Sequence, residues 1–287
     1  MTDAGWRAAL VVLRRMPLAT MSRAFGRLAD LPIPRPARRA VLGAFARALG
    51  IDLSEVARPL GDYPSLDAFF TRQLREGTRR WPPENRVFGS PVDGIAGESG
   101  RIEAGRLVQA KGIRYSVAEL LDDEAQAARF QGGAFATFYL SPRHYHRIHT
   151  PCRGVIAEAH HVPGALLPVN PPSVRSVPGL FARNERLICF VDGLAGRVAV
   201  AAVGAFNVGR ISAAFDPGWT TNRRGAGPER RTYEPPVPVA AGQEIMTFHL
   251  GSTVVLLFGP GVELRSTVVG AEVRLGDAVA RSTIDDR

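Results

Sequence analysis

Apolar residues follow two different spacings along the chain, helical in the N-terminal part and strand-like after about residue 130. Two N-terminal stretches place apolar residues three or four positions apart, the spacing of one helix face: Trp6, Leu10, Leu13 and Val41, Phe45, Leu49. Residues 31–36 separate these stretches, because their prolines remove backbone donors and clash with a preceding helical turn. The pattern predicts two short helices at the start of the chain.

Two more helices are predicted before the spacing changes. Ser65 is a suitable N-cap for a helix that runs to about Leu74. Ser116 and Glu119 form a capping box that opens a helix ending near Phe130. Eight strand-type runs then follow one another, at residues 135–140, 154–159, 187–191, 197–203, 210–215, 245–250, 253–258 and 262–269. Because strands follow strands without helices between them, we predict an α+β fold with helices first and a mainly antiparallel, β-rich body after.

The composition is that of a folded globular chain. Of its 287 residues, 45% are hydrophobic and 22% charged, which excludes a disordered tail, a collagen-like chain and a disulfide scaffold. Cys152 and Cys189 fit two buried thiols in a reducing compartment. No run approaches the roughly 18 apolar residues of a spanning helix, and no signal-peptide core precedes a cleavage site. We therefore expect the chain to keep its N-terminus and to stay inside the cell.

Most of the net charge of +9 lies in the first sixty residues, which hold ten arginines against four acids. Two short basic amphipathic helices are able to lie on an anionic membrane surface. The alternative is a pair of helices packed on their own domain with solvated arginines. No basic groove interleaved with aromatic residues is present, so the charge does not indicate a nucleic-acid partner.

Three segments carry residues suited to catalysis. Asp93 stands in the turn Ser-Pro-Val-Asp-Gly, where an ordinary turn aspartate is the alternative. His144, His146 and His149 are three of the six histidines, and histidine is the side chain best suited to proton transfer near neutral pH. Surface histidines beside an arginine are the alternative. A metal site is the rival interpretation, but no cysteine or carboxylate pair at zinc spacing accompanies them.

A Gly-Ser-Thr sequence at 251–253 interrupts two apolar runs and is the third segment. The Ser252 hydroxyl has an unhindered carbonyl before it, that of Gly251. Attack on this carbonyl would convert the amide to an ester, and His149 oriented by Asp93 would supply the base.

Several separated motifs together resemble the phosphatidylserine decarboxylase family, in its bacterial and mitochondrial type, over nearly the whole chain. In order, they are Asp93-Gly94, Gln109-Ala110-Lys111-Gly112, Tyr145-His146-Arg147-Ile148-His149, Pro168-Val169-Asn170, residues 180–186 and Leu250-Gly251-Ser252-Thr253. The resemblance implies a pyruvoyl-dependent carboxy-lyase of phospholipid biosynthesis, made as a self-cleaving proenzyme. Cleavage between Gly251 and Ser252 would give a β chain of residues 1–251 and an α chain of residues 252–287.

The resemblance also implies the roles of the site residues. Asp93 and His149 would activate Ser252 for cleavage, and Ser252 would become the pyruvoyl group that forms a Schiff base with phosphatidylserine. His146 would serve the decarboxylation, which yields phosphatidylethanolamine and CO2. The lipid substrate implies that residues 1–60 associate with the cytoplasmic side of the cell membrane and that residues 61–287 form the catalytic domain. The partners expected are the lipid, the anionic membrane surface and the second chain of an αβ heterodimer, which could assemble further, and no metal.

Two other classes stay open at this point. Asp93, His149 and Ser252 would also suit a serine hydrolase, although no Gly-x-Ser-x-Gly sequence surrounds the serine. The second of these classes is a non-enzymatic β-domain that binds membranes. Lys111 is the only lysine among 36 basic residues, and it lies in a motif that the family shares. A site that needs a compact ammonium in place of a planar guanidinium would explain this lysine, and the alternative is a surface lysine that is present by chance.

Overall fold

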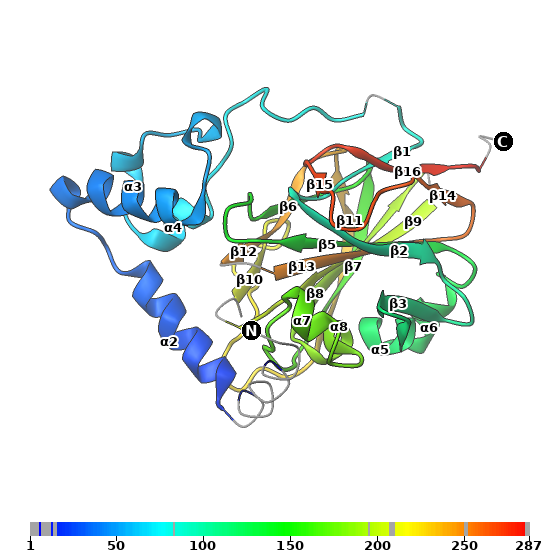
Figure 1. Cartoon of the computed structure of the whole chain (residues 1–287). Coiled ribbons are helices and arrows are strands. Elements are labelled where there is room, and N and C mark those ends of the chain that lie inside the picture. The colour runs from blue at the N-terminus through cyan, green and yellow to red at the C-terminus, as the bar shows by residue number, and fades with distance from the viewer. Residues whose placement is uncertain are drawn as a thin grey trace.

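The computed structural model describes residues 6, 13, 16–82, 84–194, 196–206, 210–249 and 252–284. Leu10 of the first expected helix, and Leu250 and Gly251 of the expected cleavage motif, lie outside these residues. The N-terminal part is helical, with α2 (Leu18–Asp30), α3 (Arg38–Leu49), α4 (Leu66–Phe70) and the 3-10 turns η1 (Arg35–Ala37), η2 (Leu53–Glu55) and η3 (Leu60–Asp62). Figure 1 shows these helices gathered to one side of the sheets. No described helix has the length and apolar character needed to cross a membrane.

The helical part has a small core of its own. Leu42, Ala46 and Phe69 are buried there, and Tyr63 packs edge-on against Phe69 with 5.4 Å between ring centroids. Gly50 ends α3 with a φ of +70°, a left-handed conformation that glycine adopts without a Cβ clash. These contacts make the helices a compact unit that precedes the sheets.

The body of the molecule is built on one antiparallel sheet of eight strands, in the order β11-β7-β8-β9-β13-β5-β2-β15. Its strands are β2 (Gly94–Arg101), β5 (Ala134–Leu140), β7 (Gly154–Val162), β8 (Arg186–Gly193), β9 (Gly196–Val203), β11 (Glu229–Val239), β13 (Ser252–Phe258) and β15 (Glu272–Val273). Strand β13 lies in the middle, paired with β5 on one side and β9 on the other. The α+β prediction, with helices first and an antiparallel body after, is confirmed.

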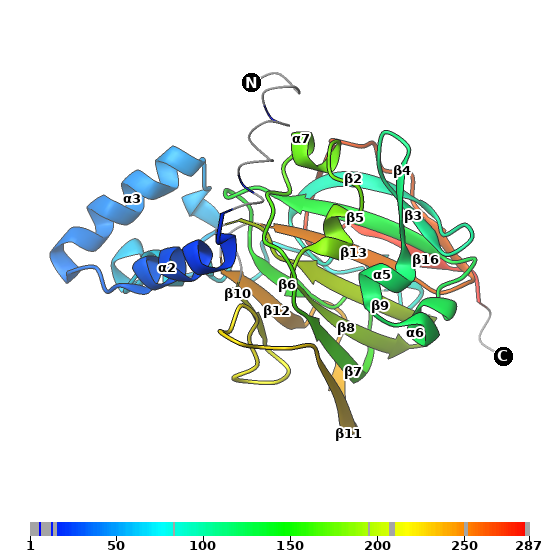
Figure 2. The ribbon, with the colours of Figure 1, turned by 90° about the horizontal axis from the view of Figure 1, so that it is seen from below.

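The two faces of this sheet are covered differently. One face packs on two three-stranded sheets, β1-β16-β14 and β10-β12-β6. Their strands are β1 (Val87–Gly89), β6 (Arg147–His149), β10 (Arg210–Ala213), β12 (Glu244–His249), β14 (Val262–Leu264) and β16 (Ala278–Ser282). The other face carries the hairpin of β3 (Arg106–Ala110) and β4 (Ile113–Ser116), with α5 (Val117–Leu121), α6 (Glu124–Ala128), α7 (Pro171–Val174) and α8 (Leu180–Arg183), as Figures 1 and 2 show.

Side chains alternate between the two faces along β13. Val254, Leu256 and Phe258 enter the core shared with the smaller sheets. Val255 and Leu257 enter the core shared with the helices and the hairpin. Period-two alternation therefore places Ser252 on the first face and Thr253 on the second.

Most predicted elements are present, with corrections at several boundaries. The helix predicted from Ser65 to about Leu74 has the expected N-cap but ends at Phe70, and the strand predicted at 210–215 ends at Ala213. The helix predicted from Ser116 to Phe130 is wrong as one element: α5 ends where Asp122 takes a φ of +54°, and Asp123 then caps the separate α6. The capping box itself is confirmed. The run at 262–269 keeps strand pairing only to Leu264. Cys152 and Cys189 are buried and free, as expected.

Candidate active site

Ser252 is the first residue of β13 and is fully buried. It pairs with Leu140 of β5, and its Oγ has no hydrogen-bond partner in the structure described. A buried hydroxyl without a partner costs about 1–3 kcal/mol, so such groups mark strain or chemistry more often than packing. The orphaned Oγ stands one peptide bond after Gly251, as a nucleophile aimed at that carbonyl requires.

His146 is equally buried, in the segment between β5 and β6. Its Nδ1 lies 2.8 Å from the carbonyl oxygen of His144, to which it donates, so Nε2 carries the lone pair. That Nε2 has no partner. Burial, and then the positive charge of Arg72, lowers the pKa of His146 well below its usual value. His146 is thus a neutral imidazole whose Nε2 has no hydrogen-bond partner, in surroundings that disfavour its protonated form.

Backbone pairing brings His146 to the strand that leads into the expected cleavage motif. Its carbonyl accepts a hydrogen bond of 2.9 Å from the amide of Phe248, four residues before Ser252. Its ring packs on Phe70 of α4, with 4.1 Å between ring centroids. The helical unit and the β body therefore both hold this side chain.

His149 ends β6 and is held through both ring nitrogens. Nδ1 donates to the carbonyl of Gly242 at 2.7 Å, and Nε2 lies 3.2 Å from the Tyr145 hydroxyl. Burial lowers the pKa of His149, although the charges of Glu244 and Asp93 partly oppose this. The tautomer leaves Nε2 as the basic atom, which suits a general base.

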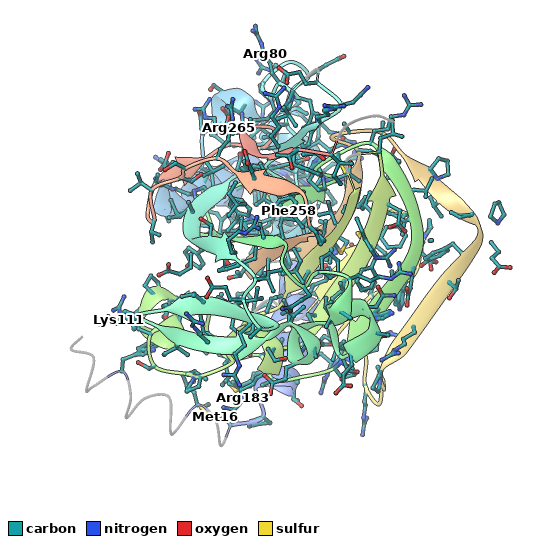
Figure 3. All side chains as sticks on the ribbon, turned by 90° about the vertical axis from the view of Figure 1, so that its right-hand side faces the viewer. Met16, Arg80, Lys111, Arg183, Phe258 and Arg265 are labelled. Carbon is teal, nitrogen blue, oxygen red and sulfur yellow. The ribbon has the colours of Figure 1, made fainter. Side chains whose placement is uncertain are left out.

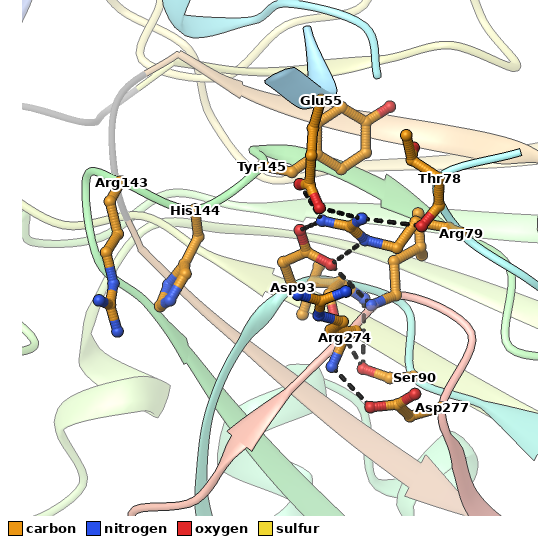
Figure 4. Close-up of polar contacts among 12 residues, drawn as sticks. Glu55, Thr78, Arg79, Ser90, Asp93, Arg143, His144, Tyr145, Arg274 and Asp277 are labelled. Carbon is orange, nitrogen blue, oxygen red and sulfur yellow. Dashed lines mark hydrogen bonds and ion pairs between the residues drawn. The ribbon is translucent and has the colours of Figure 1, made fainter. Parts of the chain in front are cut away.

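Asp93 is not hydrogen-bonded to His149, in contrast to the direct Asp-His contact expected from the sequence. Its carboxylate receives two hydrogen bonds from Arg79, of 2.8 and 2.5 Å, and one of 2.7 Å from the amide of Leu275. Figure 4 shows Arg79 between Asp93 and Glu55. Burial alone would lower the pKa of Arg79, but its hydrogen bonds to the two carboxylates raise it. The segments still meet, because the amide of His149 donates to the carbonyl of Pro91 at 2.9 Å.

The third histidine of the motif has a different position. His144 accepts a hydrogen bond of 3.0 Å on Nδ1 from the amide of Ser141, which closes the turn after β5. It also lines a polar pocket of about 170 Å³ together with Asp93, Arg79 and Tyr145. Burial lowers the pKa of His144, followed by the charge of Arg143.

A charged network that the sequence analysis missed joins the helices to β12. His249 places Nδ1 2.9 Å from the Asp67 carboxylate and Nε2 3.0 Å from the Ser212 hydroxyl. Arg210 pairs with Asp67 at 2.9 Å and with Asp30, the last residue of α2, at 2.9 Å. Burial would raise the pKa of Asp67, but the hydrogen bond and charge of His249 lower it. The network ends two residues before Gly251, so it fixes the strand that enters the cleavage motif.

Other residues of the family motifs hold loops rather than line the buried serine. The Gln109 amide donates to the carbonyls of Val174 and Val177 and accepts from the amide of Leu180. Arg186 is buried, and its guanidinium donates to four backbone carbonyls, those of Glu119, Leu120, Ala182 and Asn184. These contacts fix the chain between β7 and β8.

The described residues contain one cluster of metal-type ligands, formed by Asp123, Glu158 and His160. It lies by β7, and its carboxylates already pair with Arg230 and Arg197. The cluster is thus balanced by cations of the chain itself, and it does not include any of the expected site residues.

Comparison with known proteins decides the family. The family model described as phosphatidylserine decarboxylase matches residues 66–281. The chain belongs to the phosphatidylserine decarboxylase family. It is 52% identical to a phosphatidylserine decarboxylase proenzyme of Anaeromyxobacter sp. (strain K), over 94% of this chain and 97% of that protein. A proenzyme of the same name from Myxococcus xanthus is 43% identical, over 87% and 88%, and one from Azotobacter vinelandii is 42% identical, over 94% and 96%. Membership in this decarboxylase family makes the chain a carboxy-lyase and confirms the resemblance drawn from the motifs.

Proposed function

We propose that the chain is a phosphatidylserine decarboxylase proenzyme that cuts itself between Gly251 and Ser252 and uses the new residue 252 as a pyruvoyl group. The observation that carries this proposal is the buried Oγ of Ser252, which has no hydrogen-bond partner and follows Gly251 directly. The relatives are named proenzymes, which supports a processing step.

Self-cleavage begins when the Ser252 Oγ attacks the Gly251 carbonyl carbon and the hydroxyl proton passes to His149. The carbon–nitrogen bond then breaks, leaving an ester on Oγ and an amine on residue 252. Loss of the α-proton expels the Gly251 carboxylate by β-elimination. The resulting dehydroalanine tautomerises to an imine, which water hydrolyses to the pyruvoyl group and ammonia.

We assign this step to His149, as the family resemblance implies, and its Nδ1 contact with Gly242 leaves Nε2 as the basic atom. His149 pairs with Glu244 at the start of β12, so the assignment rests on the resemblance and not on a contact with Ser252. We assign Asp93 an indirect role. Its carboxylate fixes Arg79 and, through the segment that includes Pro91, the position of His149. The pair therefore acts without the direct hydrogen bond of a serine-protease triad.

Two buried atoms without partners, Ser252 Oγ and His146 Nε2, also suit the pyruvoyl group that cleavage would produce. A pyruvoyl group supplies a ketone that takes the substrate amine and accepts electrons while CO2 leaves. The buried Nε2 of His146, which has no partner, supports a role for this side chain in delivering the proton that the product carbon needs after CO2 leaves. His146 is accordingly the residue that we propose for decarboxylation.

The sheet explains how the two chains would stay together after cleavage. Strands β13, β15 and β16 would belong to the α chain, and each pairs with a strand of the β chain: β13 with β5 and β9, β15 with β2, and β16 with β1. A central strand with two neighbours cannot leave without exposing both cores. We infer a tightly held αβ heterodimer.

Membrane association is proposed for the helical unit. Met21, Phe25 and Leu28 are 36%, 42% and 60% exposed, and their spacing puts them on one side of α2. The buried residues of α2, Leu18, Ser22 and Ala29, take the adjoining side, so the exposed stripe borders the packed side of the helix. An exposed apolar stripe on a basic helix suits the interface of an anionic bilayer, on the cytoplasmic side of the cell membrane.

Ser252→Ala tests the proposal. On a denaturing gel this variant should give one full-length band where the parent gives two chains. His146→Ala should cleave like the parent yet lose decarboxylation of phosphatidylserine. Cleavage of Ser252→Ala would overturn the proposed site, and an intact parent chain with esterase activity would support a hydrolase.

A further inference from the structure

A cavity opens on the helix-covered face of the main sheet, next to the proposed cleavage site. Its volume is about 350 Å³, and Thr253 and Tyr139 contribute to its floor. Apolar side chains of the opposite wall include Val169, Val174 and Phe181. Thr253 directly follows Ser252, so the lining of the cavity includes the neighbour of the residue that would carry the ketone. A mainly apolar cavity of this size suits the glycerol and upper acyl region of a lipid.

Two cations line the cavity from separate elements. Lys111 stands in the turn of the β3–β4 hairpin with a φ of +48°, and Arg175 follows α7. Figure 3 shows Lys111 at the outer end of this hairpin. Glu98 is the one acid on the same lining. The lining thus carries an excess of positive charge beside apolar walls, which complements the phosphodiester of a phospholipid.

The edge of the cavity also carries exposed apolar residues. Val268 is 74% and Val269 is 58% exposed, and Val269 lines the cavity. Two hydrogen bonds of 2.8 Å pin their segment to Ala96 of β2, from the amide of Gly270 and to the carbonyl of Ala271. Adjacent exposed valines on a fixed segment are poorly suited to water and well suited to the acyl layer of a bilayer.

The N-terminal region meets the same side of the molecule. The indole of Trp6 donates to the Ser173 hydroxyl of α7 at 3.0 Å, directly before the cavity residues Val174 and Arg175. Leu18 of α2 belongs to the core on this face of the sheet. The cavity and the start of the proposed membrane-binding segment therefore share one side.

We propose that Lys111, Val268 and Val269 form a lipid rim through which phosphatidylserine passes from the bilayer to residue 252. The valines enter the acyl layer, and Lys111 holds the phosphodiester. The serine head group then points along β13, past Thr253, toward the start of the strand, where cleavage would make residue 252 a chain end. This inference rests on the proposed function, because it assumes that the ketone forms at residue 252. It also gives Lys111 a role, as a cation that arginine is able to replace.

Kinetics of the cleaved, purified enzyme test the rim. Lys111→Glu should raise KM about tenfold on both vesicle-bound and soluble short-chain phosphatidylserine, with kcat little changed, because a charge-assisted contact to phosphate is lost. Lys111→Arg should stay close to the parent. Val268→Ser with Val269→Ser should raise KM on vesicles alone. Leu194→Ser, which alters a residue that is 81% exposed in the β8–β9 turn, is the matched control and should change neither value.

An unchanged KM for Lys111→Glu would overturn the role of the cation. A double valine variant that behaves like Leu194→Ser on vesicles would overturn the role of the valines. Because only cleaved enzyme is assayed, a failure of self-cleavage would appear earlier, as an intact chain on the gel. The two proposals can therefore fail separately.

The single lysine allows a second test that needs no turnover. Acylation of Lys111 by an amine-reactive ester can be followed in one peptide by mass spectrometry. Phosphatidylglycerol vesicles, which contain no amine, should slow this acylation several-fold, whereas inorganic phosphate should leave it unchanged. Equal rates with and without vesicles would contradict the rim, and protection by inorganic phosphate alone would replace it with a simple anion site.

Discussion

The two faces of strand β13 have different surroundings, a closed core on one side and a cavity on the other. Ser252 points into the closed core between the main sheet and the smaller sheets, where it is fully buried. Thr253, one residue later, lines an apolar cavity on the other face. On the proposed function, this strand would keep the cleavage step away from water while it presents the next residue to a lipid. Maturation and substrate binding should then respond to different substitutions.

The largest expected effect is on the rate of self-cleavage, when the proposed base on the Ser252 side of β13 is replaced. His149→Gln keeps a hydrogen-bonding side chain but removes the base, so self-cleavage should slow by about a hundredfold or more. A time course of precursor made by cell-free synthesis, read on a denaturing gel, measures this. Normal cleavage would remove His149 from the mechanism and leave His146 as the candidate base.

A cavity variant should show the opposite behaviour. Val174→Phe places a larger side chain in the cavity wall, while the Gln109 contact to the Val174 carbonyl involves only backbone. Cleavage should go to completion, and kcat/KM on long-chain phosphatidylserine should fall about tenfold, as overpacking of a binding cavity commonly costs 1–3 kcal/mol. A cleavage defect in this variant would show that the two faces are not independent.

Breaking the charged network at His249 should slow self-cleavage less than removing the base does. Asp67→Asn removes the charge that holds both His249 and Arg210, so β12 should be less firmly placed and cleavage should slow several-fold. The cleaved enzyme should keep its turnover number. Asp216→Asn breaks a comparable partly buried pair with Arg231 and is the control. Equal cleavage rates in the two variants would argue against a positioning role.

The smallest effect concerns pH. Burial lowers the pKa of His149 from its ordinary value of 6.5, so the neutral, basic form persists below that pH. The rate of cleavage should therefore stay level as the pH falls from neutral to about 6.5 and decline only below it. A rate already halved at or above pH 6.5 would point to a base other than a buried histidine.

The sequence predicts local features of this molecule better than its long-range pairs. The apolar run at 253–258 predicted β13, the capping box of α5 was correct, and the order of the motifs identified the family. The partner of Asp93 was not predictable, because Arg79 is one of 35 arginines and no pattern sets it apart.

Contacts between segments that are distant in the sequence were not predicted, for a related reason. Asp67 and His249 are 182 positions apart and meet only once the helical unit docks on β10 and β12. The cavity beside Thr253 is likewise assembled from β2, β5, β13, the β3–β4 hairpin, the chain between β7 and β8 and residues 269–270, so that its lining appears only in the fold. Burial of Ser252 and His146 without partners is a property of packing, which no single motif reveals.

The central claim is that residue 252 becomes a pyruvoyl group when the chain cuts itself. The intact mass of the purified protein tests it most directly. The account predicts two chains, with residues 252–287 lacking a free N-terminal amine and lighter than encoded by the difference between a serine and a pyruvoyl group. A single intact chain, or an α chain that still begins with an unmodified serine, would contradict it.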